Sequence, residues 1–125
     1  MATNYSFKTS KNNDLIHVSR SGVDKSLFTA SDFISVDTNG FPSDENKDAV
    51  PSAETLIHCT LYKLFPETTV ILHSHSVYPV LISQIHSNKV EFEGYEIQKG
   101  FAGQTTHDAR LNIPIFDNTQ DMIAF

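Results

Sequence analysis

The sequence predicts an α/β fold built around a mixed sheet. Segments with strand character and segments with helical character alternate only loosely along the chain, as in α/β and α+β folds with mixed sheets. The best strand, over residues 68–73, runs directly into a helical segment over 76–87. The chain has 125 residues, of which 39% are hydrophobic, so it has the size of one domain and can bury a core.

The N-terminal part of the chain predicts two short strands and a long loop. Residues 15–20 (LIHVSR) and 33–37 (FISVD) are rich in β-branched and apolar residues, and a turn region containing Gly22 separates them. Residues 38–54 are rich in Gly, Pro, Asn and Asp, which is typical of a loop. This loop is too short to act as a boundary between domains.

A helix is predicted over residues 51–65, where Pro66 stops it. Ser52 is the expected N-cap, and Glu54 falls in the positive first turn. Cys59, the only cysteine, excludes an internal disulfide and is expected to be a small core residue. Helical spacing predicts that one apolar face packs on the core, formed by Ile57, Leu61, Leu64 and Phe65.

The C-terminal part combines a strand, a helix and shorter elements. The helix over 76–87 begins at Ser76, a good N-cap. Two short strands around a turn-and-helix segment are then predicted within 89–100 and 110–118, and the start of another helix over 119–125.

Composition excludes several classes of protein. A formal net charge of −6 argues against a nucleic-acid partner, which requires a basic surface. No apolar run approaches the roughly 20 residues of a membrane span, and the N-terminus lacks the apolar core of a signal peptide. We therefore expect a cytoplasmic protein with a small-molecule partner, with no nucleic acid and no membrane among its partners.

His73 and His75 stand at the end of the best strand, in the stretch VILHSHS. Residues i and i+2 of a strand point to the same face, so the two imidazoles can converge on one point. Imidazole is a neutral ligand of Zn²⁺, and a catalytic zinc site also needs a third ligand and an open position. The alternative is that both are ordinary histidines at a strand–helix junction.

Three stretches together resemble the class II aldolase/adducin family. They are PSAETLIHCTLYKLFP, VILHSHS and EGYEIQKGFAGQTTHDARLNIPIFDNTQD. The resemblance implies a three-layer α/β/α fold with a largely antiparallel central sheet, usually assembled as a homotetramer. It also implies that residues 1–125 form a single domain of this type, incomplete because an N-terminal helix and a C-terminal part are missing.

The resemblance implies a lyase with one Zn²⁺ per subunit, held by His73, His75 and a third histidine expected beyond Phe125. The motifs GYEIQK and IPIFDN are similar to those of the dehydratases of methionine salvage. The implied reaction is loss of water from 5-methylthioribulose 1-phosphate to give 5-methylthio-2,3-dioxopentyl phosphate. We expect the 125-residue chain alone to bind zinc weakly and to be inactive.

The resemblance also assigns roles to other residues. Glu96 is implied as the acid/base, and Glu54 as a second carboxylate beside the zinc with a supporting or shared role. The alternatives are a solvated glutamate and an ordinary first-turn charge. The phosphate is expected on the Asn of an N-terminal loop, on a Ser-Gly turn and on the Ser at the start of the helix, namely Asn4, Ser21, Gly22 and Ser52.

The remaining histidines are not expected to be ligands. His107 is interpreted as a structural residue or a support for the site, while His17, His58 and His86 are interpreted as ordinary histidines. Two other functions stay open. One is a class II sugar-phosphate aldolase or epimerase with the same zinc, and the other is an adducin-like interaction module, which the presence of His73 and His75 disfavours.

Overall fold

The computed structural model describes residues 3–9 and 12–119 of the chain. The described residues form two compact units. The first unit runs to His75 and includes Thr119, and the second unit is Ser76–Asn118. Apart from Thr119, the helix predicted over 119–125 lies outside the described residues. That one domain spans the whole chain stays a prediction.

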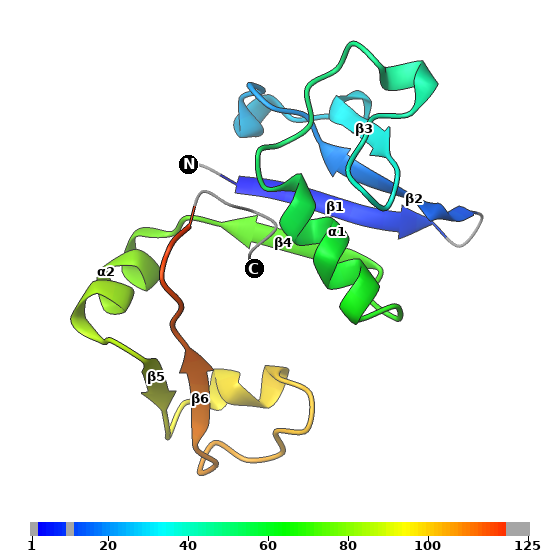
Figure 1. Cartoon of the computed structure of the whole chain (residues 1–125). Helices are drawn as coiled ribbons and strands as arrows, with labels where there is room; N and C mark the ends of the chain where they lie inside the picture. The colour runs from blue at the N-terminus through cyan, green and yellow to red at the C-terminus, as the bar shows by residue number, and fades with distance from the viewer. Residues whose placement is uncertain (1–2, 10–11, 120–125) are drawn as a thin grey trace. The chain divides into compact units, whose positions relative to one another are not determined.

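The first unit is built on a four-stranded sheet with the order β3-β2-β1-β4 (Figure 1). The strands are β1 (Thr3–Thr9), β2 (Asn12–Ser19), β3 (Phe33–Val36) and β4 (Val70–Ser74). Every neighbouring pair in this sheet is antiparallel. The sheet is therefore antiparallel throughout, and β1 lies inside it between β2 and β4.

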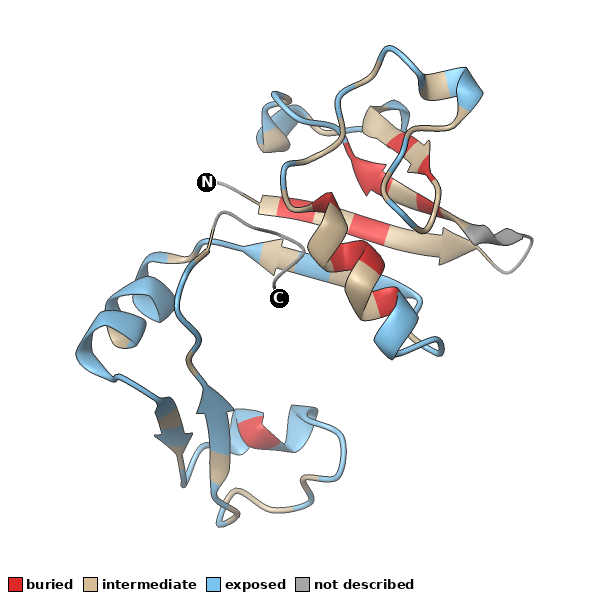
Figure 2. Ribbon diagram, in the orientation of Figure 1, coloured by how far each residue is buried: buried red, intermediate tan, exposed pale blue. Residues whose placement is uncertain are grey.

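One helix, α1 (Thr55–Leu64), lies across this sheet (Figure 1). Alternate residues of β2 and β3 point toward one buried layer, as the two-residue period of a strand requires. Figure 2 shows the buried residues of the first unit gathered on the sheet and on α1. The apolar core is formed by Ile16, Val18, Ile34, Val36, Cys59 and Tyr62.

The prediction of which face of α1 packs on the core is wrong. Leu64 and Phe65 are 65% and 51% exposed. The helix instead buries a face that carries polar groups, formed by Thr55, His58, Cys59 and Tyr62. Helical periodicity of apolar residues missed this face because buried polar side chains are stable where their hydrogen bonds are satisfied. The prediction that Cys59 is buried is confirmed.

The N-terminal segment is also different from the expectation. The segment around Asn4, expected to be a loop, forms the inner strand β1. Its register pairs Ser6 with Val18 on one side and with Ile71 on the other. Pairing on both sides satisfies the backbone of this polar segment, so it forms a strand despite its low apolar content.

The long loop predicted over 38–54 is present between β3 and α1, with a short 3₁₀ turn at Asp44–Asn46. Gly40 sits in this loop with a φ of +86°, a conformation that favours glycine. A Cβ at this position would lie 3.0 Å from Leu56 Cδ2. Gly40 therefore allows both the turn and the close approach of the loop to α1.

The second unit contains α2 (Val77–Ile85), the antiparallel pair β5 (Lys89–Phe92) and β6 (Leu111–Pro114), and a 3₁₀ helix at Glu96–Gly100. These match the predicted helix and the two predicted strands. Ser76 is at the N-cap position of α2, although its side chain makes no capping hydrogen bond. Among the described helices, none combines the length and the apolar character needed to cross a membrane.

Candidate functional site

The two histidines of the His-x-His motif lie at the end of β4. Their Nε2 atoms are 2.7 Å apart, so one nitrogen donates to the other. The ring centroids are 4.7 Å apart. The convergence expected from the spacing of His73 and His75 is therefore present.

Glu54 completes a group of three possible metal donors. Its Oε1 is 3.9 Å from His75 Nε2. One donor atom from each of Glu54, His73 and His75 lies within 4.8 Å of the others. Two imidazoles and one carboxylate are ligands that suit Zn²⁺, and tetrahedral zinc holds two nitrogens about 3.3 Å apart. The donor set fits zinc after only small side-chain adjustments.

The start of α1 positions Glu54 in a way that differs from the expected cap. Glu54 itself is at the N-cap position, and α1 begins at Thr55. Ser52 does not cap the helix with its side chain, because its Oγ donates to Glu54 Oε2 at 2.9 Å. The helix starts later because the carbonyl of Ser52 accepts from Thr55 N at 3.1 Å and from Thr55 Oγ1 at 2.7 Å.

A buried set of polar side chains leads from the helix–sheet interface to Glu54. Asn4 Nδ2 donates to Glu54 Oε2 at 2.9 Å. Asn4 Oδ1 is bonded to His58 Nε2, and His58 Nδ1 is 2.6 Å from Ser6 Oγ. Ser6 Oγ is in turn 2.9 Å from the Tyr62 hydroxyl. Asn4, Ser6, His58 and Tyr62 are each at most 5% exposed.

Burial determines the protonation of this set. It lowers the pKa of His58 to about 4, with a smaller contribution in the same direction from His73 and an opposing one from Glu54. Burial also raises the pKa of the Tyr62 hydroxyl, with an opposing contribution from its hydrogen bond with Ser6. Both side chains are therefore neutral at pH 7.

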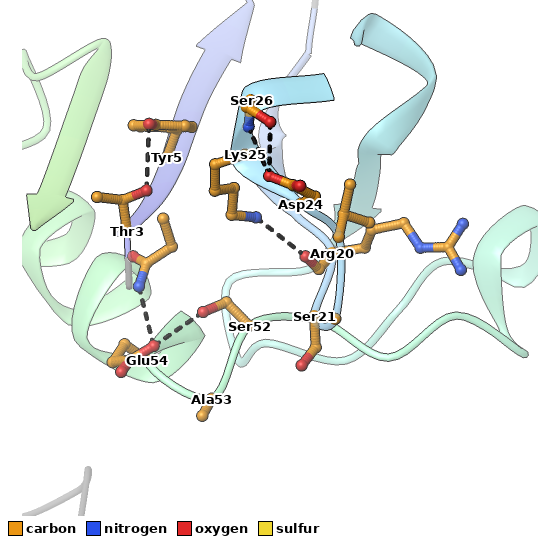
Figure 3. Close-up of a pocket in the computed structure, with 13 residues that line it drawn as sticks. Thr3, Tyr5, Arg20, Ser21, Asp24, Lys25, Ser26, Ser52, Ala53 and Glu54 are labelled. Carbon is orange, nitrogen blue, oxygen red and sulfur yellow. Dashed lines mark hydrogen bonds between the residues drawn. The ribbon is translucent and has the colours of Figure 1, made fainter. Parts of the chain in front are cut away.

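An open cavity of about 650 Å³ lies beside Glu54, at the N-terminal end of α1 (Figure 3). Figure 3 shows the hydrogen bonds that converge on Glu54 at one side of the cavity, with Ser21 and Ser52 on neighbouring segments. Its lining also includes two cationic residues, Arg20 and Lys25, and two acidic ones, Asp24 and Glu54. All four residues predicted to bind phosphate are among its lining residues, namely Asn4, Ser21, Gly22 and Ser52.

Glu96 belongs to the second unit, at the first position of the 3₁₀ helix Glu96–Gly100. Its side chain is 70% exposed, forms an ion pair with Lys99 Nζ at 2.7 Å and lies 3.0 Å from His107 Nδ1. His107 therefore contacts the predicted acid/base, and its role as a structural or supporting residue stays a prediction. The acid/base role of Glu96 stays a prediction.

Sequence reasoning missed the parts that Ser6, His58 and Tyr62 play around Glu54. A signal was present in the pattern of polar residues. Asn4 and Ser6 are two positions apart in a strand, and His58 and Tyr62 are four apart in a helix. Each spacing places two polar groups on one face, and two such faces pack only if they bond to each other.

Known proteins share sequence and fold with this chain. The family model described as "Class II Aldolase and Adducin N-terminal domain" matches residues 1–124. A methylthioribulose-1-phosphate dehydratase from a Picosynechococcus species is 53% identical over 99% of this chain and 58% of its own length. The protein of that name from Yersinia enterocolitica is 46% identical over 86% of this chain and 50% of its own length. The chain thus spans between half and three-fifths of these relatives.

One solved structure shares the fold. An L-fuculose 1-phosphate aldolase superposes with a TM-score of 0.60 and 22% sequence identity. The match covers 74% of this chain and 41% of that one. This likeness confirms the predicted class II aldolase-like α/β fold with a largely antiparallel sheet.

Proposed function

Because this chain belongs to the class II aldolase and adducin N-terminal domain family, we propose that it carries the metal- and phosphate-binding groups of a zinc-dependent dehydratase. The observation that carries the proposal is the convergence of Glu54, His73 and His75. The substrate proposed is 5-methylthioribulose 1-phosphate, since relatives up to 53% identical are named as dehydratases of this compound. The product is 5-methylthio-2,3-dioxopentyl phosphate.

The metal is assigned to side chains at the end of β4. His73 and His75 would be the zinc ligands, with Glu54 close enough to act as a ligand or as a neighbouring base. Zinc, when bound, supplies a Lewis acid that stabilises negative charge developing on the carbonyl and hydroxyl oxygens of the substrate.

The reaction needs proton transfers at two positions. A proton leaves the carbon beside the ketone, and hydroxide leaves the next carbon with a proton supplied by an acid. We assign the acid/base role to Glu96, which is held between Lys99 and His107. Glu54 has the shared or supporting role, because its Oε2 already accepts from Asn4 and Ser52 while Oε1 faces His75.

The phosphate group is assigned to the cavity at the start of α1. Support comes from the lining, which brings the turn at Ser21 and Gly22 together with Ser52 from a second segment. Arg20 and Lys25 add positive charge to the same cavity, and charge-assisted bonds to phosphate are stronger than neutral ones. Of the four predicted phosphate residues, Asn4 is the least accessible at 3% exposure.

The substrate test compares two sugar phosphates. The protein, at the full length that its gene encodes and loaded with Zn²⁺, is assayed on 5-methylthioribulose 1-phosphate and on L-fuculose 1-phosphate. We expect dehydration of the first and no cleavage of the second. Cleavage of the second substrate alone would establish an aldolase, and inactivity on both with no zinc bound would favour an adducin-like module.

The acid/base assignment is tested by Glu96→Gln in the same protein. Removing a proton carrier without removing a ligand should leave the zinc content unchanged and lower kcat by about 10²- to 10⁴-fold. Glu93→Gln is the matched control, since Glu93 is an exposed glutamate of the same unit that pairs with Arg110. Near-normal turnover of Glu96→Gln would remove Glu96 from the mechanism. Homotetrameric assembly and a cytoplasmic location stay predictions.

A further inference from the structure

Four buried side chains connect the interior of the first unit to Glu54. Asn4 and Ser6 come from the inner strand β1, and His58 and Tyr62 come from α1. Their hydrogen bonds run without a break from the Tyr62 hydroxyl to Glu54 Oε2. We call these four residues the polar relay.

The direction of every bond in the polar relay follows from its end at Glu54. A carboxylate oxygen only accepts, so Asn4 presents its NH₂ group to Glu54 and its Oδ1 to His58. Because Oδ1 also only accepts, the proton of the neutral imidazole must be on Nε2. The lone pair on Nδ1 then accepts from the Ser6 hydroxyl, which is 2.6 Å away.

The far end of the polar relay completes the sequence of donors. Ser6 gives its only hydroxyl proton to His58, so its oxygen accepts from the Tyr62 hydroxyl at 2.9 Å. Each group donates toward Glu54, and no buried side-chain N or O atom among the described residues lacks a hydrogen-bond partner. Chains of hydrogen bonds with one direction polarise one another and strengthen the last donor.

We propose that His58 is a positioning residue: as the Nε2–H tautomer it fixes the Asn4 amide, which holds the Glu54 carboxylate toward His75. This inference rests on the proposed function, because Glu54 is important for catalysis only if that function is correct. It gives Asn4 a structural role in addition to any contact with phosphate. It also explains why α1 buries a polar face where an apolar face is available on the same helix.

The geometry excludes free rotation of the connecting groups. Asn4 and Ser6 are in a strand paired on both sides, and His58 is 0% exposed. A flip of the Asn4 amide would place its NH₂ group against the Nε2–H of His58 and its oxygen against the carboxylate. Both contacts are repulsive, so the orientation of Glu54 is coupled to the tautomer of His58.

The first test measures the tautomer directly. Two-bond ¹⁵N–¹H NMR spectra of the chain labelled at histidine, recorded at pH 7.5 without metal, should show His58 protonated at Nε2 and unprotonated at Nδ1. Ser6→Ala should keep this tautomer, because Asn4 sets it. A wild-type His58 protonated at Nδ1, or a tautomer that changes in Ser6→Ala, would overturn the proposal.

The second test measures the effect on the metal donors by titration with Zn²⁺ alone. Residues that orient metal ligands change metal affinity by about 10- to 100-fold when they are mutated. We expect His58→Phe to weaken Zn²⁺ binding by about tenfold or more. His58→Gln should recover part of the loss, because its amide N–H can still reach Asn4 Oδ1.

The matched control is Cys59→Ala. Cys59 is a buried neighbour on the same helix, outside the polar relay, so this variant should lose stability and keep its Zn²⁺ affinity. Equal Zn²⁺ affinity in His58→Phe and in the wild type would overturn the proposal. The proposed function fails if the wild-type protein binds no Zn²⁺. In that case the NMR measurement of the His58 tautomer still decides whether the polar relay is correct.

Discussion

The two units of the chain are ordered in different ways. In the first unit, apolar side chains from β2, β3 and α1 form a buried cluster. In the second unit, all of whose residues are described, Gln98 is the only buried residue. Its helix α2 buries none of its residues, and Tyr78 and Ile85 are 78% and 77% exposed.

Hydrogen bonds organise the second unit instead of an apolar core. The amide of Gln98 donates to the carbonyls of Phe92 and Ala109 and accepts from the N–H of Tyr95. These bonds join β5, the 3₁₀ helix and the segment before β6. Glu54 therefore adjoins a helix that packs on an apolar core, while Glu96 lies on a segment held by one buried amide.

The largest effect is expected from the core of the first unit. Ile16→Ala removes a side chain that is 1% exposed and should lower the unfolding free energy by about 2–5 kcal/mol, measured by urea denaturation. Ile97→Ala in the second unit is the control, since Ile97 is 80% exposed and should change stability by less than about 0.5 kcal/mol. Equal losses of unfolding free energy in the two variants would contradict the contrast between the units.

The next largest effect is a dependence of stability on pH that arises from a residue of the first unit. The pKa of His58 is about 4 in the folded chain and 6.5 as an ordinary value. Between these two pH values the unfolded chain binds more protons than the folded chain. The contribution of His58 to the free energy of unfolding is therefore fully present above about pH 6.5 and is lost as the pH falls toward 4, by up to about 3 kcal/mol. Urea denaturation at pH 7.5, 6 and 5 without metal measures this.

Two variants isolate the contribution of His58. His58→Gln should remove that part of the pH dependence, because it removes the buried group that titrates. His86→Gln, at an exposed position of the second unit, should keep the wild-type dependence. A His58→Gln chain with an unchanged pH profile would show that burial of His58 is not responsible.

A third prediction concerns the buried amide of the second unit. Gln98→Leu keeps the size of the side chain and removes the hydrogen bonds that two carbonyls and one N–H make with Gln98, which should destabilise that unit by about 1–3 kcal/mol. Amide hydrogen exchange should rise around β5 and β6 and stay unchanged in β1 and β2. Gln84→Leu, at an exposed position of α2, is the control. A loss of protection spread over both units would contradict separate ordering.

The smallest effect compares one glycine from each unit. Gly40 and Gly94 both have positive φ, +86° and +83°, so alanine at either position introduces strain of about 1–2 kcal/mol. Only at Gly40 does a Cβ approach a neighbour, Leu56 Cδ2 at 3.0 Å. Thermal unfolding should therefore show a larger loss for Gly40→Ala than for Gly94→Ala. The reverse order would contradict the tighter packing of the first unit.

Local sequence signals predicted much of this structure. The run Val70-Ile71-Leu72 predicted β4, and the His73–His75 spacing predicted the convergence of the two rings. Both follow from the period of a single strand, which short segments of sequence display directly. The helix and the two strands of the second unit were also predicted, the helix from its N-cap residue Ser76.

Features that depend on two segments at once were not predictable in the same way. Counting apolar residues assigned the wrong face of α1, because the partners of His58 and Tyr62 lie more than fifty residues away in β1. The assignment of Ser52 as a cap failed for a local reason instead, because its hydroxyl donates to Glu54, two residues further along the chain. A polar side chain can be buried only where it has a hydrogen-bond partner. For His58 and Tyr62 that partner lies in another segment of the chain.

The burial of Cys59 has a consequence for the chemical behaviour of the chain. The thiol is 2% exposed, and burial raises its pKa to about 11, so almost none is thiolate at neutral pH. Alkylating and oxidising reagents act on the thiolate. The only sulfhydryl of the chain thus stays inert while α1 covers the sheet, and its rate of labelling reports how often that interface opens.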